Sequence, residues 1–157
     1  MEFDYIIVGA GSAGCVLAAR ITEDPKISVL LLEAGGENNS LWINMPAALS
    51  IPMNMKSYNW GFLSEPEPNL NNRRITCPRG KGLGGTSSIN GMAWVRGNPL
   101  DYENWANLGA KGWKYKDVLP YFCRAENLAK TTSPWRGNHG PVKITRGVQT
   151  NPLYQTF

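Results

Sequence analysis

The feature that most constrains the fold is a glycine-rich turn near the amino terminus, which has the sequence GAGSAG at residues 9–14. A short apolar run at residues 5–8 precedes it, and residues 12–23 carry apolar side chains at helix-compatible spacings. A second apolar run at residues 27–32 completes a pattern of strand, helix and strand. The sequence therefore predicts a βαβ unit in a parallel sheet, with strands covered on both faces.

Each glycine of this turn suits a dinucleotide-binding loop. Gly9 permits a tight turn, Gly11 lets the backbone approach a pyrophosphate, and Gly14 permits close packing of the helix on the sheet. Free N–H groups at the helix start would then bind the anion. Glu33 follows the second strand, where its carboxylate can accept both hydroxyls of an adenosine ribose and would repel a 2′-phosphate. This pattern predicts a dinucleotide site but does not separate FAD from NAD.

A second glycine-rich passage favours the longer cofactor. Residues 80–88 have the sequence GKGLGGTSS and lead into apolar residues. A flavin dinucleotide needs separate segments to hold its pyrophosphate and its isoalloxazine, whereas a simple nicotinamide-binding fold needs no such loop this far downstream. We therefore expect residues 79–103 to form a second FAD-contacting motif. The structural alternative is a glycine-rich linker.

The composition argues against several other classes of protein. The formal net charge of +4 is scattered along the chain and forms no stripe typical of nucleic-acid binding. The cysteines Cys15, Cys77 and Cys123 form no C-x-x-C pair, which fits a reducing, cytoplasmic location without a metal site or disulfides. No apolar stretch approaches the roughly 20 residues of a membrane span. Attachment at a membrane surface stays open.

The rest of the chain is less regular. Residues 37–74 are rich in proline and asparagine, and we expect an irregular excursion that docks on another part of the protein. Helices are predicted at residues 101–108 and 116–128, and a strand at residues 141–145. The last residues resemble the first turn of a helix with Asn151 as its N-cap, so we expect the C-terminal end to be incomplete.

Several stretches carry a family resemblance that covers nearly the whole chain. Besides residues 4–14, they are LEAGG at 32–36, YNW at 58–60 and NRR at 72–74. Residues 80–103 are similar throughout to a signature pattern of the same family. The chain resembles the N-terminal, FAD-binding part of the glucose–methanol–choline (GMC) oxidoreductases, and within that family it is most similar to choline dehydrogenases and related alcohol dehydrogenases.

The resemblance implies an α/β fold, a three-layer Rossmann-type FAD-binding domain with irregular extensions. Residues 1–157 would be the N-terminal FAD-binding portion, with the βαβ unit at residues 4–33 and most of the substrate domain missing. The pyrophosphate would lie on residues 9–14 and the ribose on Glu33, while residues 90–93 and Trp60 would lie near the flavin. The expected cofactor-binding residues are Gly9, Gly11, Ser12, Ala13, Gly14, Glu33, Ala34, Trp60, Gly82, Gly85, Thr86, Asn90, Gly91, Met92 and Ala93.

Two further expectations concern the chemistry. Some relatives, the choline oxidases, carry a histidine bonded covalently to the flavin just before the equivalent of Asn90. Ile89 stands there in this chain, so FAD is expected to bind noncovalently. The family places its catalytic histidine and a His or Asn partner near the C-terminus of a longer chain. The chain's one histidine, His139, is expected in a surface turn, and no catalytic residue can be named.

The expected function is oxidation of a primary alcohol, choline or a related compound, to the aldehyde by hydride transfer to FAD. The partners would be a small-molecule alcohol and an electron acceptor, either a quinone or carrier or oxygen. The alternatives are a non-catalytic truncated fragment and one half of a split flavoenzyme, each binding only FAD. A nicotinamide-dependent dehydrogenase is a further alternative, against which the second glycine loop argues.

Overall fold

The computed structural model describes residues 2–147 and 150–156. The chain divides into two compact units, of which the first ends at Ala93 and the second begins at Trp94. The first unit contains both glycine-rich passages. Among the helices of the described residues, none is long and apolar enough to cross a membrane.

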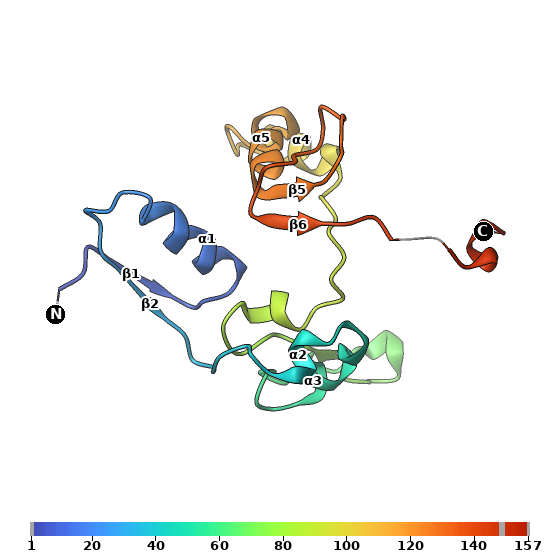
Figure 1. Ribbon diagram of the computed structural model, residues 1–157. Coiled ribbons are helices and arrows are strands. Elements are labelled where there is room, and N and C mark those ends of the chain that lie inside the picture. The colour runs from blue at the N-terminus through green and yellow to red at the C-terminus, as the bar shows by residue number, and fades with distance from the viewer. Residues whose placement is uncertain (1, 148–149, 157) are drawn as a thin grey trace. The chain divides into compact units, whose positions relative to one another are not determined.

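The first unit begins with the predicted βαβ unit. Strand β1 (Tyr5–Val8), helix α1 (Ser12–Ile21) and strand β2 (Val29–Leu32) follow one another, and the two strands pair in parallel, with Tyr5 opposite Val29. Helix α1 lies alongside this strand pair (Figure 1). Gly14 makes this packing possible, because a Cβ atom there would lie 1.9 Å from the Gly9 carbonyl oxygen. The predicted βαβ unit is confirmed, although α1 ends two residues earlier and β2 begins two residues later than predicted.

The expectation that these strands are covered on both faces is wrong for the described structure. Ile6 is 62% exposed and Val8 is 83% exposed. The sheet at this point consists of β1 and β2 alone, and α1 cannot cover both of its faces. The apolar runs identified the strands correctly, but burial depends on neighbouring layers that such a run does not encode.

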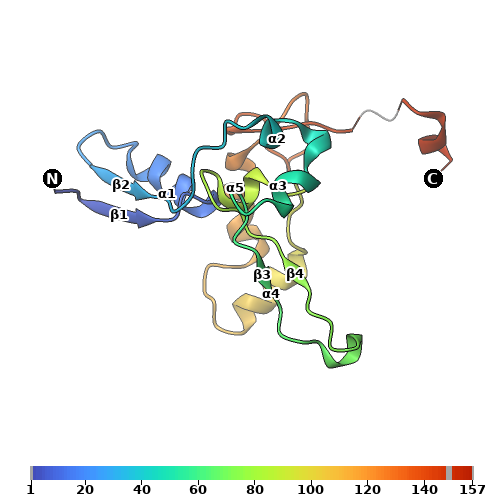
Figure 2. The ribbon, with the colours of Figure 1, turned by 90° about the horizontal axis from the view of Figure 1, so that it is seen from below.

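Residues 37–74 contain more structure than the expected irregular excursion. Helix α2 (Leu41–Asn44) and helix α3 (Ser50–Asn54) precede a hairpin of β3 (Phe62–Leu63) and β4 (Thr76–Cys77). The hairpin extends as a long arm that ends in the 3-10 turn Pro68–Leu70 (Figure 2).

This segment docks on the second glycine passage, as expected. The Trp60 N–H donates to the Arg79 carbonyl at 2.9 Å, and the Lys81 N–H donates to the Tyr58 carbonyl at 2.8 Å. The Asn59 amide, which is 7% exposed, adds side-chain hydrogen bonds: its oxygen accepts from the N–H groups of Arg79 and Gly61. Residues 58–61 are therefore held beside residues 79–81.

The second unit pairs two helices with two short strands. Helix α4 (Pro99–Asn107) is capped by the Asn98 side chain, which accepts from the Leu100 N–H at 3.0 Å. Helix α5 (Tyr115–Ala125) leads directly into β5 (Glu126–Leu128), which pairs in parallel with β6 (Val142–Ile144).

The predicted helix over residues 116–128 is therefore too long. The backbone leaves the helical conformation at Glu126, whose φ and ψ are −100° and 150°. The predicted strand at residues 141–145 is confirmed by β6. Near the end of the chain, Asn151 caps the turn Pro152–Gln155 as predicted, by accepting from the Leu153 N–H, but the turn is of the 3-10 type.

Candidate functional site

The two glycine-rich loops of the first unit lie directly against each other. The Gly84 N–H donates to the Ala10 carbonyl at 2.8 Å, and Gly11 and Gly84 form a parallel β-bridge. A Cβ atom added to Gly85, whose φ is +55°, would lie 2.9 Å from the Gly11 Cα. The contact therefore depends on glycine on the second loop, and it was not foreseen from the spacing of the motifs.

Glu33 joins the loops through its carboxylate. One oxygen, Oε2, accepts from the Ala10 N–H at 2.7 Å. The other, Oε1, accepts from the N–H groups of Gly35 at 2.9 Å and Gly82 at 3.0 Å. The bond from Gly35 contributes most to holding the pKa of Glu33 below its ordinary value; burial opposes it, and the backbone groups of Ala10, Gly82 and Ala34 lower the pKa further.

An open cavity of about 600 Å³ lies along the line where the loops meet. Seven of the expected cofactor-binding residues line it. Its full lining is Val8, Gly9, Gly11, Leu32, Glu33, Ala34, Trp60, Gly80, Gly85 and Thr86. The structure thus gathers residues from β1, β2, the excursion and both glycine loops around one space.

The first loop has the properties of an anion cradle. A Cβ atom added to Gly9 or Gly11 would meet no other atom within 4 Å, so the backbone at both positions borders open space. Gly11 stands at the N-cap of α1 without a capping side chain, and the first turn of the helix contains no acidic residue. Ser12 and Ala13 are exposed in that turn. The first N–H groups of the helix are therefore available to a phosphate group.

Trp60 lines the same cavity as Glu33. Its ring stacks on Phe62 with the centroids 6.2 Å apart, and the Lys81 ammonium lies 5.0 Å from the Trp60 ring centroid. Gly82 packs against Gly36, whose carbonyl oxygen would lie 2.8 Å from a Cβ atom on Gly82. Both glycines therefore serve the joint between the loops.

The expected residues at positions 90–93 belong to a segment that lines a second cavity of about 340 Å³. Asn90 and Met92 line it together with buried Ile89, while Gly91 and Ala93 are exposed between and beside them. The Asn90 side chain accepts from the Met92 N–H at 2.8 Å, which stabilises a turn in which Met92 has a φ of +58°. The segment at residues 84–88 lines both cavities, so the structure brings the two groups of expected residues together.

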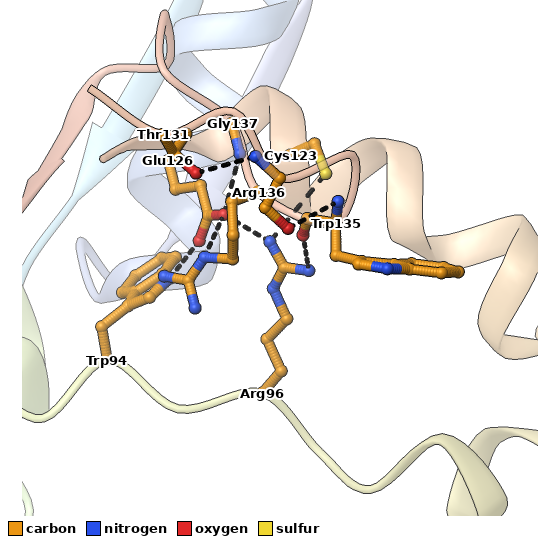
Figure 3. A network of polar contacts seen from close by, with 9 residues as sticks. Trp94, Arg96, Cys123, Glu126, Thr131, Trp135, Arg136 and Gly137 are labelled. Carbon is orange, nitrogen blue, oxygen red and sulfur yellow. Dashed lines mark hydrogen bonds and ion pairs between the residues drawn. The ribbon is translucent and has the colours of Figure 1, made fainter. Parts of the chain in front are cut away.

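The second unit contains a buried carboxylate that the sequence analysis missed. Glu126 is fully buried and forms ion pairs with Arg96 and with Arg136, whose Nε lies 2.8 Å from Oε1 (Figure 3). The Trp94 indole N–H donates to Oε2 at 2.8 Å, and the Gly137 N–H donates to Oε1 at 2.9 Å. Burial alone would raise the pKa of Glu126, but these donors and cations hold it below its ordinary value.

No local signal could have revealed this cluster, because its members come from three separated stretches of the chain. Arg96 also donates to the Trp135 carbonyl, and its guanidinium lies 5.4 Å from the Phe122 ring centroid. The cluster joins the segment before α4, the end of α5 and the loop before β6. The cluster has the features of a structural anchor, because its hydrogen-bond acceptors and its charged groups contact one another.

His139 lies on an exposed bend before β6, as expected for a surface histidine. Among the described residues, no group of three or more histidine, cysteine, aspartate or glutamate side chains could hold a metal ion.

Comparison with known proteins identifies relatives over the whole chain. A family model described as GMC oxidoreductase matches residues 3–157. An oxygen-dependent choline dehydrogenase from Rhizobium etli (strain CIAT 652) is 59% identical over 157 residues, which are 100% of this chain and 29% of the relative.

Solved structures show the same relationship. Pyridoxine 4-oxidase from Mesorbium loti matches with a TM-score of 0.91 at 35% identity, over 98% of this chain and 30% of that one. An FAD-dependent oxidoreductase from Chaetomium thermophilum matches with a TM-score of 0.85 at 34% identity, over 98% of this chain and 28% of that one.

The chain spans less than a third of the length of these relatives. The α/β fold class and the family resemblance drawn from the sequence are both confirmed. The glycine loops, Glu33 and the match over residues 3–157 lead to one conclusion: the chain belongs to the GMC oxidoreductase family.

Proposed function

We propose that this chain binds FAD noncovalently and forms the cofactor-holding part of an enzyme that oxidises a primary alcohol to an aldehyde. The observation that carries the proposal is the cavity of about 600 Å³ at the joint of two glycine loops, with Glu33 beside it. The space suits an elongated, anionic dinucleotide because uncapped helix N–H groups and glycine backbone border it.

The geometry supports the proposed binding roles. Gly11 and the first turn of α1 would hold the pyrophosphate, and Glu33 would accept a hydrogen bond from the adenosine ribose. Residues 90–93, beside the second cavity, would contact the flavin end. When bound, FAD supplies the hydride acceptor, while these residues fix its position.

Noncovalent binding is supported by Ile89. This side chain is 3% exposed and lines the second cavity, and its alkyl group has no atom that could bond to the flavin. Denaturation with trichloroacetic acid should therefore leave the flavin in the supernatant. Yellow colour retained in the precipitated protein would contradict this part of the proposal.

The substrate class is proposed from the relatives. Choline or a similar primary alcohol is favoured by the 59% identity to the Rhizobium etli enzyme, with a quinone, a carrier or oxygen as electron acceptor. A base is needed to take the alcohol proton. His139 lies on an exposed bend, which does not suit a catalytic base. We therefore propose that the base comes from another part of a longer protein.

The setting of the protein is proposed from its thiols. Cys15, Cys77 and Cys123 are all free, which fits the reducing conditions of the cytoplasm. The 157-residue chain alone is proposed to bind FAD without turning over alcohol.

The test is a titration of the purified chain with FAD, followed by quenching of flavin fluorescence and by thermal unfolding. We expect saturable quenching and a rise in Tm with FAD concentration, because a ligand that binds only the folded state stabilises it. NAD should give neither effect. The proposal fails if FAD leaves both fluorescence and Tm unchanged.

A further inference from the structure

The carboxylate of Glu33 accepts three hydrogen bonds from the backbone of this protein, so binding a ligand is not its only role. Its three donors are the N–H groups of Ala10, Gly35 and Gly82, at 2.7, 2.9 and 3.0 Å. Ala10 lies 23 positions before Glu33 and Gly82 lies 49 positions after it. One side chain thus connects the first glycine loop, the end of β2 and the second glycine loop.

These bonds occupy most of the carboxylate's acceptor positions. An ionised carboxylate offers about four lone-pair sites, two on each oxygen. The N–H groups of Gly35 and Gly82 take both sites on Oε1, and the Ala10 N–H takes one on Oε2. Glu33 lines the 600 Å³ cavity, so the one site left over is the site available to a ligand there. The sequence-based expectation that Glu33 can accept both ribose hydroxyls would need two free acceptor sites, and it stays a prediction.

We infer that Glu33 is a positioning residue that assembles the two glycine loops before the cofactor arrives, and that it accepts a single hydroxyl of the adenosine ribose. The inference rests on the proposed FAD site. Binding is strengthened when a site needs no rearrangement, because the ordering cost has been met during folding. Neighbouring backbone bonds support the joint: the Leu83 N–H donates to the Gly36 carbonyl and the Gly84 N–H to the Ala10 carbonyl.

The inference predicts that both the charge and the shape of the carboxylate are required. In a Glu33→Gln variant, an NH₂ group replaces one oxygen and faces N–H donors, so at least one backbone group loses its acceptor. The matched control is Glu37→Gln, since Glu37 is an exposed carboxylate nearby that accepts from the Asn39 side chain.

The first experiment measures amide hydrogen exchange in the FAD-free chain. In Glu33→Gln, we expect exchange to accelerate about tenfold or more at Ala10, Gly35 and Gly82, because each loses or weakens a bond to a charged acceptor. Glu37→Gln should leave these rates unchanged. Equal rates in wild type and Glu33→Gln would overturn the positioning role.

The wild-type chain provides a test that needs no folded variant. In isotope-labelled, FAD-free protein, scalar couplings across hydrogen bonds should connect the amide nitrogens of Gly35 and Gly82 with the carboxyl carbon of Glu33. Their absence would also overturn the inference. Neither of these two measurements contains FAD, so a failure of the proposed function and a failure of the positioning role are distinguishable.

A third experiment, with FAD present, counts the hydroxyls that Glu33 binds. FAD and two analogues, lacking the 2′- or the 3′-hydroxyl of the adenosine ribose, are titrated into wild type and Glu33→Gln, which forms a double-mutant cycle for each hydroxyl. We expect one hydroxyl to couple to Glu33 with an affinity change of about tenfold and the other not to couple. Coupling of both hydroxyls would overturn the single-acceptor count, and coupling of neither would remove Glu33 from the ribose site.

Discussion

Glycines of the same motif serve opposite purposes in this protein. A Cβ atom on Gly11 would extend into open space, whereas one on Gly14 would lie 1.9 Å from the Gly9 carbonyl oxygen. Gly11 also has a φ of −74° and a ψ of −174°, which other residues adopt freely. Gly11 therefore keeps space for a ligand, and Gly14 keeps space for the packing of α1 on the strands.

The substitution Gly11→Val separates these purposes. We expect the variant to fold with a Tm close to that of wild type and to bind FAD about 100-fold more weakly or worse, because the branched side chain fills the space proposed for the pyrophosphate. Gly14→Ala should instead destabilise the fold by about 1 to 3 kcal/mol or more, through overpacking against the backbone. Circular dichroism melting and fluorescence titration measure the two effects. Retention of tight FAD binding by Gly11→Val would refute the proposed cradle.

Glu126 anchors the second unit, and its removal leaves Arg96, which is 11% exposed, and the partly exposed Arg136 without their buried counter-charge. Glu126→Gln should lower the free energy of unfolding by about 3 to 5 kcal/mol, as expected when one partner of a buried ion pair is lost. Asp101→Asn, at an exposed carboxylate in the first turn of α4, should change it by less than about 1 kcal/mol. Urea unfolding distinguishes these outcomes, and equal effects would show that the cluster is not an anchor.

The pH dependence of stability follows from the same carboxylate. Because the folded-state pKa of Glu126 lies below its ordinary value, its contribution is fully present above the unfolded-state pKa of about 4.3. That contribution is lost as the pH falls through the lowered folded-state pKa. We expect Glu126→Gln to flatten the acid limb of a plot of unfolding free energy against pH. An unchanged acid limb would show that another group controls it.

At the scale of elements, local sequence patterns predicted the helices and strands that depend on nearby residues. The apolar runs and the GAGSAG turn located β1, α1 and β2 within two residues, since both strands and the helix have their own periodicity. Residues 126–128 were placed in a helix because nothing nearby in the sequence contradicts one. The strand there depends on distant partners: β6, and the Gly140 N–H that donates to the Glu126 carbonyl at 3.0 Å.

The joint between the glycine loops was beyond sequence reasoning for the same reason. The motifs indicated which residues approach a dinucleotide, and they suggested loops at opposite ends of it. The pairing of Gly84 with Ala10 and Gly11 depends on backbone contacts between segments about seventy residues apart, which leave no periodic signature.

Asn59 is the side chain that fixes the excursion to this joint. Its amide donates to the Met53 carbonyl at 2.6 Å and accepts from Gly61 and Arg79. Asn59→Ala should cost about 2 to 3 kcal/mol of unfolding free energy, because the three backbone groups bonded to its buried amide lose their partner. It should also weaken FAD binding, since the adjacent Trp60 lines the cavity.

The matched control is Asn54→Ala in α3, where an exposed amide donates only to the Ser50 carbonyl. We expect a cost below about 1 kcal/mol and unchanged FAD affinity. If the two alanine variants behave alike in urea unfolding and FAD titration, Asn59 does not hold the segment in place.

At the scale of the whole molecule, the first unit contains the proposed binding residues and the second contains an independent buried cluster. The central claim is that residues 9–14 and 80–93, far apart in sequence, form one cofactor site. A site built in this way should respond as a unit when its ligand binds, whereas two separate glycine-rich turns would not.

Hydrogen exchange with mass spectrometry, measured on the chain with and without saturating FAD, tests this claim most directly. We predict that FAD slows exchange in peptides covering residues 9–14, 33–36 and 80–93 together, while the hairpin tip at residues 68–73, which lines neither cavity, keeps its rate. Protection confined to residues 9–14, with residues 80–93 unaffected, would contradict the account.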